Sequence, residues 1–199
     1  MANEISTEQN VFSISGAKVA KVTTNTSDTY ATATAMELPE LQEMDVTITK
    51  ETKEATYGAG KKADTFTILT GLDVKFTSVN IPLDVIAMIN GSTIEKSGTT
   101  PNRKVVLKDN INQVPALFAL SFKTDYVNGE PADFHETIHC VKGLLDVQTK
   151  ADDYWTCSFE GSACERKKDH ELRTIEGNET KADISFTEAT TTPEENEGA

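Results

Sequence analysis

The segment "HETIHC", residues 135–140, carries the side chains of this sequence that best suit a metal ion. It contains His135, His139 and Cys140, and zinc accepts imidazole nitrogen and thiolate sulfur as ligands. In an extended strand the two histidines would share a face but lie about 13 Å apart, which is too far for one ion. Cys140 would point to the other face. We therefore favour two surface histidines beside a buried cysteine, and we expect no metal and no other cofactor.

A second candidate is "YGAGKKAD", residues 57–64, in which two glycines and two lysines suggest a phosphate-binding loop. It lacks the spacing of a Walker loop, and no helical pattern follows it. Neither the dinucleotide fingerprint, the serine-hydrolase elbow nor the zinc-protease helix motif occurs in the sequence. Carboxylates are plentiful, but no spacing singles out a catalytic pair. We expect a protein that is not an enzyme.

The three cysteines, Cys140, Cys157 and Cys164, are an odd number in a sequence that begins without a recognisable export signal. Cys157 and Cys164 could pair across a turn only if their Cα atoms came within about 7 Å. Free thiols in a reducing cytoplasm are the favoured interpretation. No segment approaches the roughly 20 apolar residues of a membrane helix, so no membrane anchor is expected.

The chain is acidic, with 19 basic against 32 acidic residues and a formal net charge of −13. A protein that binds DNA or RNA tightly needs a basic face to neutralise phosphates, so tight nucleic-acid binding is not expected. Solubility alone is the simplest explanation of the charge. The basic run "ERKKDHELR", residues 165–173, is either a solvated loop or a contact for an acidic patch on another copy, and the sequence leaves both open.

Threonine supplies 28 of the 199 residues, and this β-branched residue favours strands. The expected fold is mainly β, a sandwich or barrel with one short flanking helix, a long loop and terminal arms. Residues 1–14 are expected to form an N-terminal arm, residues 15–187 a single domain, and residues 188–199 an acidic disordered tail. The expected strands are residues 15–24, 29–37, 43–58, 73–79, two within 92–108, two within 115–149, 153–165 and 181–188.

The expected helix covers about residues 82–90. Pro82 suits its first turn, Asp84 suits the positive end of its dipole, and Asn90-Gly91 is a stop signal. The helix is apolar on nearly every face, which is unusual for the surface helix of a monomer. It therefore packs beneath a sheet, or another subunit covers one of its faces.

The strand that begins at residue 43 changes character near its middle. Val46 and Ile48 alternate with polar residues, whereas the chain from Lys50 onward is polar on both faces. A strand with polar side chains on both faces has no apolar face to pack against the core of a monomer. This part is predicted to project as a hairpin arm or to lie on a partner, with residues 57–66 as a loop.

Four segments, taken in order, resemble the major tail protein (tail tube protein) family of long, flexible-tailed bacteriophages. They are "SISGAKVAKVT", "LPELQEMDVTITKETKEATYGAGKKADTF", "GLDVKFTSVNIPLDVIAMIN" and the late hairpin "ALFALSFKT…NG…HETIHCVKGLL". The resemblance covers about residues 14–187 and rests on the order of features. It implies a β-sandwich flanked by a helix, six copies of which form a ring whose inner sheets join into one barrel.

The resemblance also implies a function. Rings would stack into a tube through which double-stranded DNA leaves the capsid, with an acidic lumen that DNA passes without binding. The protein would lie in the virion tail, assemble in the bacterial cytoplasm, and meet tape-measure, tail-tip and terminator proteins. An alternative is another virion module, for decoration or receptor binding, which would expose aromatic side chains.

Two sets of residues acquire candidate roles through this resemblance. The candidate inter-ring loop comprises Lys50, Glu51, Lys53, Glu54, Tyr57, Gly58, Lys61 and Lys62. The candidate inter-subunit helix surface comprises Leu83, Val85, Ile86, Met88 and Ile89.

Overall fold

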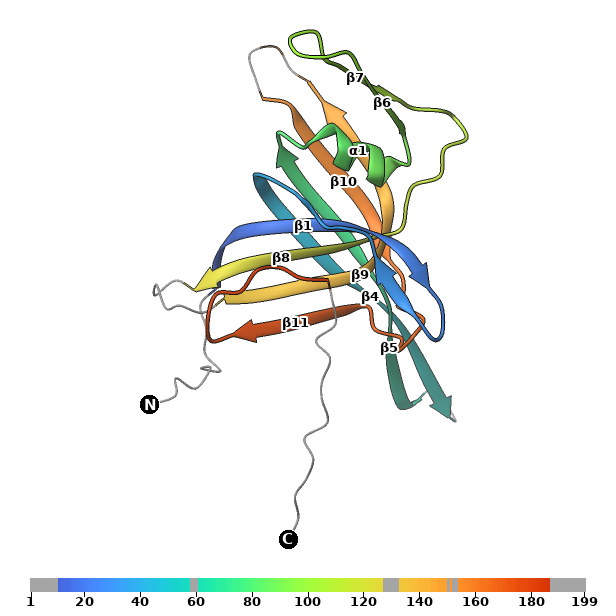
Figure 1. The fold of residues 1–199 in the computed structure, drawn as a ribbon. Helices are drawn as coiled ribbons and strands as arrows, with labels where there is room; N and C mark the ends of the chain where they lie inside the picture. The colour runs from blue at the N-terminus through green and yellow to red at the C-terminus, as the bar shows by residue number, and fades with distance from the viewer. Residues whose placement is uncertain (1–10, 58–60, 127–132, 150, 152–153, 187–199) are drawn as a thin grey trace.

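A computed structural model describes residues 11–57, 61–126, 133–149, 151 and 154–186. In this part of the chain, one curled antiparallel sheet forms a half-barrel, a separate two-stranded hairpin stands beside it, and one short helix lies against the open side (Figure 1). The predicted mainly β fold with one short helix is confirmed.

The large sheet contains nine strands, and the main path through it is β2-β1-β8-β9-β10-β5-β4. β3 pairs with β1, and β11 pairs with β9. The small sheet is the hairpin β6–β7, as the turn-rich segment 92–108 predicts. The strands are β1 (Val11–Asn25), β2 (Tyr30–Thr32), β3 (Met36–Glu37), β4 (Leu41–Tyr57), β5 (Lys61–Val79), β6 (Thr93–Ser97), β7 (Lys104–Lys108), β8 (Phe118–Tyr126), β9 (Asp133–Gln148), β10 (Thr156–Ala163) and β11 (Arg173–Asn178).

Strand β9 joins the two halves of the half-barrel. Its first half pairs with β8 and β11, and its second half pairs with β10. Val141 stands at the junction, where it lies opposite both Phe118 of β8 and Ala163 of β10. Between this junction and the pair Leu120–Ile138 the register shifts, because two residues of β9 face one residue of β8. Such a bulge bends the strand and increases its twist.

A pair of glycines allows close packing of an aromatic ring near this junction. Gly143 of β9 lies directly opposite Gly161 of β10, and the ring of Phe159 lies over both. A Cβ atom would come within 2.7 Å of the ring at Gly143 and within 2.6 Å at Gly161. No side chain fits at either position without displacing the ring or the backbone, so this close packing of the Phe159 ring on the two strands requires glycine.

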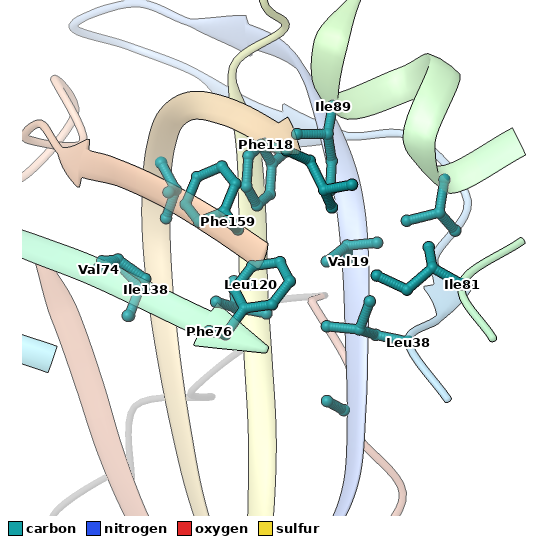
Figure 2. Packing of buried hydrophobic residues seen from close by; sticks show 14 of the residues in the cluster. Val19, Leu38, Val74, Phe76, Ile81, Ile89, Phe118, Leu120, Ile138 and Phe159 are labelled. Atoms are coloured by element: carbon teal, nitrogen blue, oxygen red, sulfur yellow. The ribbon is translucent and has the colours of Figure 1, made fainter. Parts of the chain in front are cut away.

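The helix α1 (Leu83–Asn90) closes the open side of the half-barrel over the aromatic core (Figure 2). Phe159 stacks on Phe76, with centroids 4.8 Å apart, and meets Phe118 edge-on at 5.4 Å. Gly91 ends the helix in the left-handed conformation, as predicted. Pro82 occupies the position before the helix, although the sequence placed it in the first turn.

Asn90, the last residue of α1, caps the edge of β9 that faces away from β10. Its Nδ2 donates to the carbonyl oxygen of Leu145 at 2.9 Å, and its Oδ1 accepts from the Leu145 amide at 2.8 Å. The two residues are buried, so water cannot replace these bonds readily. The side-chain amide of Asn90 thus makes the two backbone hydrogen bonds that a neighbouring strand would otherwise make.

Three predicted element boundaries are wrong. β5 begins at Lys61 and pairs with β4 as far as Tyr57, so residues 61–66 are strand and not loop. β1 begins at Val11, inside the segment predicted as an arm. Residues 181–186 form neither helix nor strand, while β11 lies earlier in the chain. Residues 1–10 and 187–199, predicted as arm and tail, lie outside the described residues.

Candidate functional site

The hairpin β4–β5 projects beyond the rest of the sheet and is the most distinctive surface of the molecule. β10 pairs with β5 only between Leu72 and Val79. From Leu72 to the pair Tyr57–Lys61, β4 and β5 continue as a two-stranded ribbon (Figure 1, lower right). We call residues 48–57 and 61–71 the ribbon.

The ribbon exposes large apolar side chains on both of its faces. Phe66 lies opposite Lys53 and is 63% exposed, while Leu69 lies opposite Lys50 on the other face and is 54% exposed. Ile48 and Tyr57 are also exposed. The core of one chain covers none of these four side chains, and grouped exposed apolar residues mark interaction surfaces.

The candidate inter-ring residues fall on this ribbon. Lys50, Glu51, Lys53, Glu54 and Tyr57 are exposed on β4. Gly58 lies outside the described residues, and Lys61 and Lys62 begin β5. The structure therefore brings the seven described members of this set together on one hairpin, in which two threonine side chains also bond across the strands.

Sequence reasoning missed Leu69 and the exposure of Ile48, whereas Phe66 lies at the end of the segment predicted as a loop, residues 57–66. In "TFTILTG", residues 65–71, Phe66 and Ile68 alternate with threonine as in a strand, and Leu69 adds an apolar residue on the other face. Because such alternation usually marks a buried face, exposure on a ribbon was not expected from the pattern alone.

An acidic face lies on the side of β4, β5, β9 and β10 that points away from the core. Register places exposed carboxylates in alternate positions across these strands, with two lysines among them. The hydrogen bond and the charge of Glu160, 2.7 Å away, raise the pKa of Lys75. The acidic face comprises Glu43, Asp45, Asp73, Asp146 and Glu160 together with Lys75 and Lys142, so carboxylates outnumber ammonium groups.

The candidate inter-subunit helix surface is largely internal. Val85, Ile86 and Ile89 are at most 1% exposed and belong to the core of the same chain. Leu83 and Met88 are partly buried at the edge of that core. The apolar character of α1 is thus satisfied mainly within one chain, and only these last two residues retain surface for a second subunit.

The residues of "HETIHC" belong to separate polar clusters. The buried Asp133 accepts hydrogen bonds from His135 Nε2 at 3.1 Å, Asn178 Nδ2 at 3.0 Å and the Ala182 amide at 2.9 Å. Burial alone would raise the pKa of Asp133, but these bonds and the nearby histidine outweigh burial and hold the pKa below its ordinary value. The cluster fastens the segment after β11 to the start of β9.

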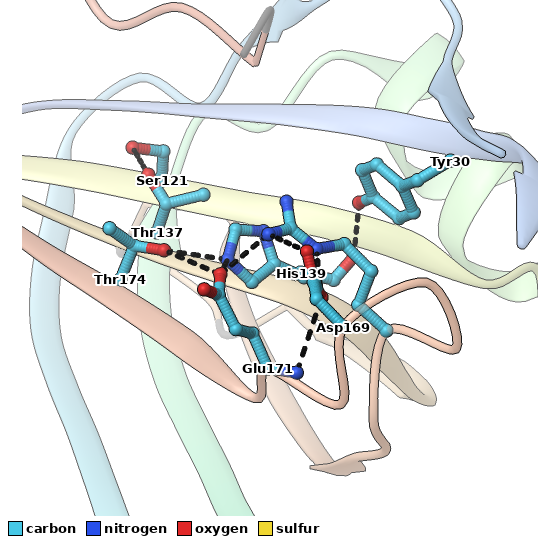
Figure 3. A network of polar contacts seen from close by, with 8 residues as sticks. Tyr30, Ser121, Thr137, His139, Asp169, Glu171 and Thr174 are labelled. Carbon is cyan, nitrogen blue, oxygen red and sulfur yellow. Dashed lines mark hydrogen bonds and ion pairs between the residues drawn. The ribbon is translucent and has the colours of Figure 1, made fainter. Parts of the chain in front are cut away.

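His139 belongs to a second cluster, on the outer side of the sheet (Figure 3). Its Nε2 lies 2.8 Å from Thr174 Oγ1, and its carbonyl oxygen accepts from the hydroxyl of Tyr30 at 2.5 Å. The buried guanidinium of Arg166 lies over the Tyr30 ring and pairs with Asp169 and Glu171 of its own loop.

These two clusters correct two expectations. Both histidines are buried, at 6% exposed each, and not at the surface. Arg166, from the basic run 165–173, is buried within its own chain, although the other charged residues of that run are mostly exposed. Among the described residues no group of three histidine, cysteine or acidic side chains is placed to hold a metal ion.

The cysteines are free thiols, two buried and one exposed. Cys157 points into the core, and Cys140 is buried on the opposite side of the sheet. The exposed Cys164 lies opposite Cys140 and not beside Cys157, since its amide donates to the Cys140 carbonyl oxygen at 2.8 Å. The pairing considered from the sequence spacing is therefore not the one that the fold brings together.

No protein-family model matches this chain, and no curated protein matches it at a significant level. Within the described residues, no helix is both long enough and apolar enough to cross a membrane.

Proposed function

We propose that this chain is a structural subunit of a bacteriophage tail, a major tail protein that forms hexameric rings and stacks them into a tube. The observation that carries the proposal is the ribbon, whose apolar side chains are exposed on both faces. A two-stranded hairpin alone is marginally stable in water. Contact with a second ring would bury Phe66 and Leu69 and would give the ribbon a partner.

The acidic face supports the same proposal from electrostatics. In the proposed tube this face lines the lumen, where its carboxylates would repel the phosphates of passing double-stranded DNA. The net charge of −13 has the sign that such a lumen needs. DNA would pass without specific binding, and the chain would need no cofactor and perform no catalysis.

The unpaired outer edge of β4 supports the part of the proposal in which neighbouring copies join into a ring. Among the described residues, β4 forms a ladder only with β5, so its other edge is open along the sheet. An open edge of this kind accepts a strand from another chain. In the proposed ring, a neighbouring copy supplies that strand, and tape-measure, tail-tip and terminator proteins set the length and the ends of the tube.

A second candidate is a decoration or receptor-binding module of a virion. It is favoured by exposed aromatic side chains, since Tyr154 is 73% exposed and Tyr57 and Phe66 are 63% exposed each. Such a module would remain a small soluble species at high concentration, which separates it from a tube subunit.

The test is negative-stain microscopy of the concentrated full chain, together with light scattering for mass. We expect rings or hollow tubes. The double variant Phe66→Ser/Leu69→Ser should stay folded by circular dichroism but fail to stack, because it removes the apolar contacts of the ribbon. Val105→Ser, an exposed apolar position on β7, is the matched control and should assemble. A wild-type chain that stays monomeric, alone and with purified tail-tip complexes, would refute the proposal.

A further inference from the structure

Two thiols meet at the point where the β9–β10 ladder ends. The last pair of that ladder is Ala163 with Val141, and the next residues in register are Cys164 and Cys140. The amide of Cys164 donates to the carbonyl oxygen of Cys140 at 2.8 Å, so the two backbones remain in contact. Residues directly opposite each other in antiparallel strands have Cα atoms about 4.5–5.5 Å apart. A disulfide needs about 4.4–6.8 Å.

Both side chains also lie on the same side of the sheet. Ala163 is buried on the core side, so Cys164 faces outward in the next position. The β9 bulge turns Cys140 to the same outer side, where Asn25 Nδ2 lies 3.4 Å from its sulfur. Burial, followed by the charge and hydrogen bond of the neighbouring Cys164, raises the pKa of Cys140 to about 12. The two sulfurs are therefore neighbours, with one reachable from solvent.

We propose that Cys140 and Cys164 form an oxidation site, which closes into an intrachain disulfide when the chain meets a low-molecular-weight disulfide such as oxidised glutathione. The exposed Cys164 loses a proton, and its thiolate attacks one sulfur of the small disulfide, releasing one thiol and leaving a mixed disulfide. Cys140 then loses its proton and attacks Cys164 Sγ, releasing the second thiol. Two cysteine thiols are oxidised, and one small disulfide is reduced to two thiols.

The cross-link would fasten the loop that begins at Cys164 to the middle of β9. This loop carries Arg166, whose guanidinium packs over Tyr30, so the covalent bond would secure the outer cluster around His139. The inference does not rest on the proposed assembly into a tube, because it uses only the positions of two sulfurs within one chain.

The test uses the full chain and its Cys157→Ser, Cys164→Ser and Cys140→Ser variants, incubated with oxidised glutathione near pH 8. Intact mass and peptide mapping should show that the wild type and Cys157→Ser each lose two hydrogen atoms and link residues 140 and 164. Cys140→Ser should stop at the mixed disulfide on residue 164, and Cys164→Ser should not form the 140–164 link. The oxidised wild type should melt on the order of 5–10 °C higher, and a reducing agent should reverse the shift.

Two results would overturn the inference. One is a wild-type chain that stops at the mixed disulfide. The other is a Cys164 that links two chains, which appears as a dimer on a non-reducing gel. Both are measured on the wild type and on Cys157→Ser, so neither result depends on whether the Cys140→Ser variant folds.

Discussion

Replacing Asn90 with alanine tests whether one side chain holds the edge of β9. The change removes the donor and the acceptor that bond the carbonyl oxygen and the amide of Leu145. Both backbone groups are left without their partner in a buried site, and each loss costs about 1–3 kcal/mol. Alanine is the better helix former by about 0.5 kcal/mol, which offsets a small part of this cost. We expect the free energy of unfolding to fall by about 3 kcal/mol.

Urea unfolding followed by circular dichroism measures this loss directly. With a slope of about 2 kcal/mol per molar urea, the midpoint should fall by about 1.5 M. Asn90→Asp should lose at least as much at pH 7, because it keeps an acceptor, loses the donor, and places a carboxylate against a carbonyl oxygen. The matched control is Asn112→Ala, at an exposed position, which should change stability by less than about 0.5 kcal/mol. If Asn90→Ala and the control unfold at the same urea concentration, the edge-capping role is refuted.

Two further predictions concern the packing of Gly161 against Phe159 and the loss of stability at low pH. Gly161→Ala should lower Tm by about 5 °C in calorimetry, because its Cβ would lie 2.6 Å from the Phe159 ring. In the control Gly16→Ala, the Cβ meets only a flexible lysine side chain, so Tm should not change. Equal shifts of Tm in the two variants would contradict the steric argument. Asp133 has its pKa lowered in the folded chain, so its contribution is present above the unfolded pKa and disappears as pH falls through the folded one. Asp133→Asn should therefore flatten the pH dependence of stability below about pH 5, whereas the exposed Asn112→Ala, which removes no ionisable group, should not. If stability falls with decreasing pH as steeply in Asp133→Asn as in the wild type, this carboxylate is excluded as a cause.

Local signals were enough to predict α1 and the alternating core strands. Pro82 and Gly91 mark the two ends of the helix within a single stretch of chain, and each acts on its own backbone. Phe118 and Leu120, like Val74 and Phe76, alternate at the strand period and are buried as that period predicts. These features depend on residues that are neighbours in sequence.

Features set by distant partners could not be predicted from the sequence. β11 carries one large apolar residue, Ile175, which is exposed, and its strand form depends on pairing with β9. His139 is buried because Thr174 and Tyr30, both far away in the chain, bond to it. Spacing arguments treat such residues as surface, since a polar side chain is buried only when a partner is present.

The candidate site was predicted in part. The polarity of β4 beyond Lys50 indicated that this region leaves the body of the protein, and the ribbon does so. Its partner strand was mistaken for a loop, because the glycines and lysines between Tyr57 and Lys62 are typical of one. The exposure of Phe66 follows from how far the hairpin extends past β10, and this length is a property of the whole sheet.

The position of β9 has a consequence for how the chain opens. This strand is a member of both halves of the half-barrel, with β8 and β11 along its first half and β10 along its second. Neither half can separate without breaking a ladder of the strand that both share. We therefore expect the two halves to unfold as one cooperative unit, with the central amides of β9 among the slowest to exchange with solvent. The ribbon, which lies beyond β10, is expected to open and exchange independently of that unit.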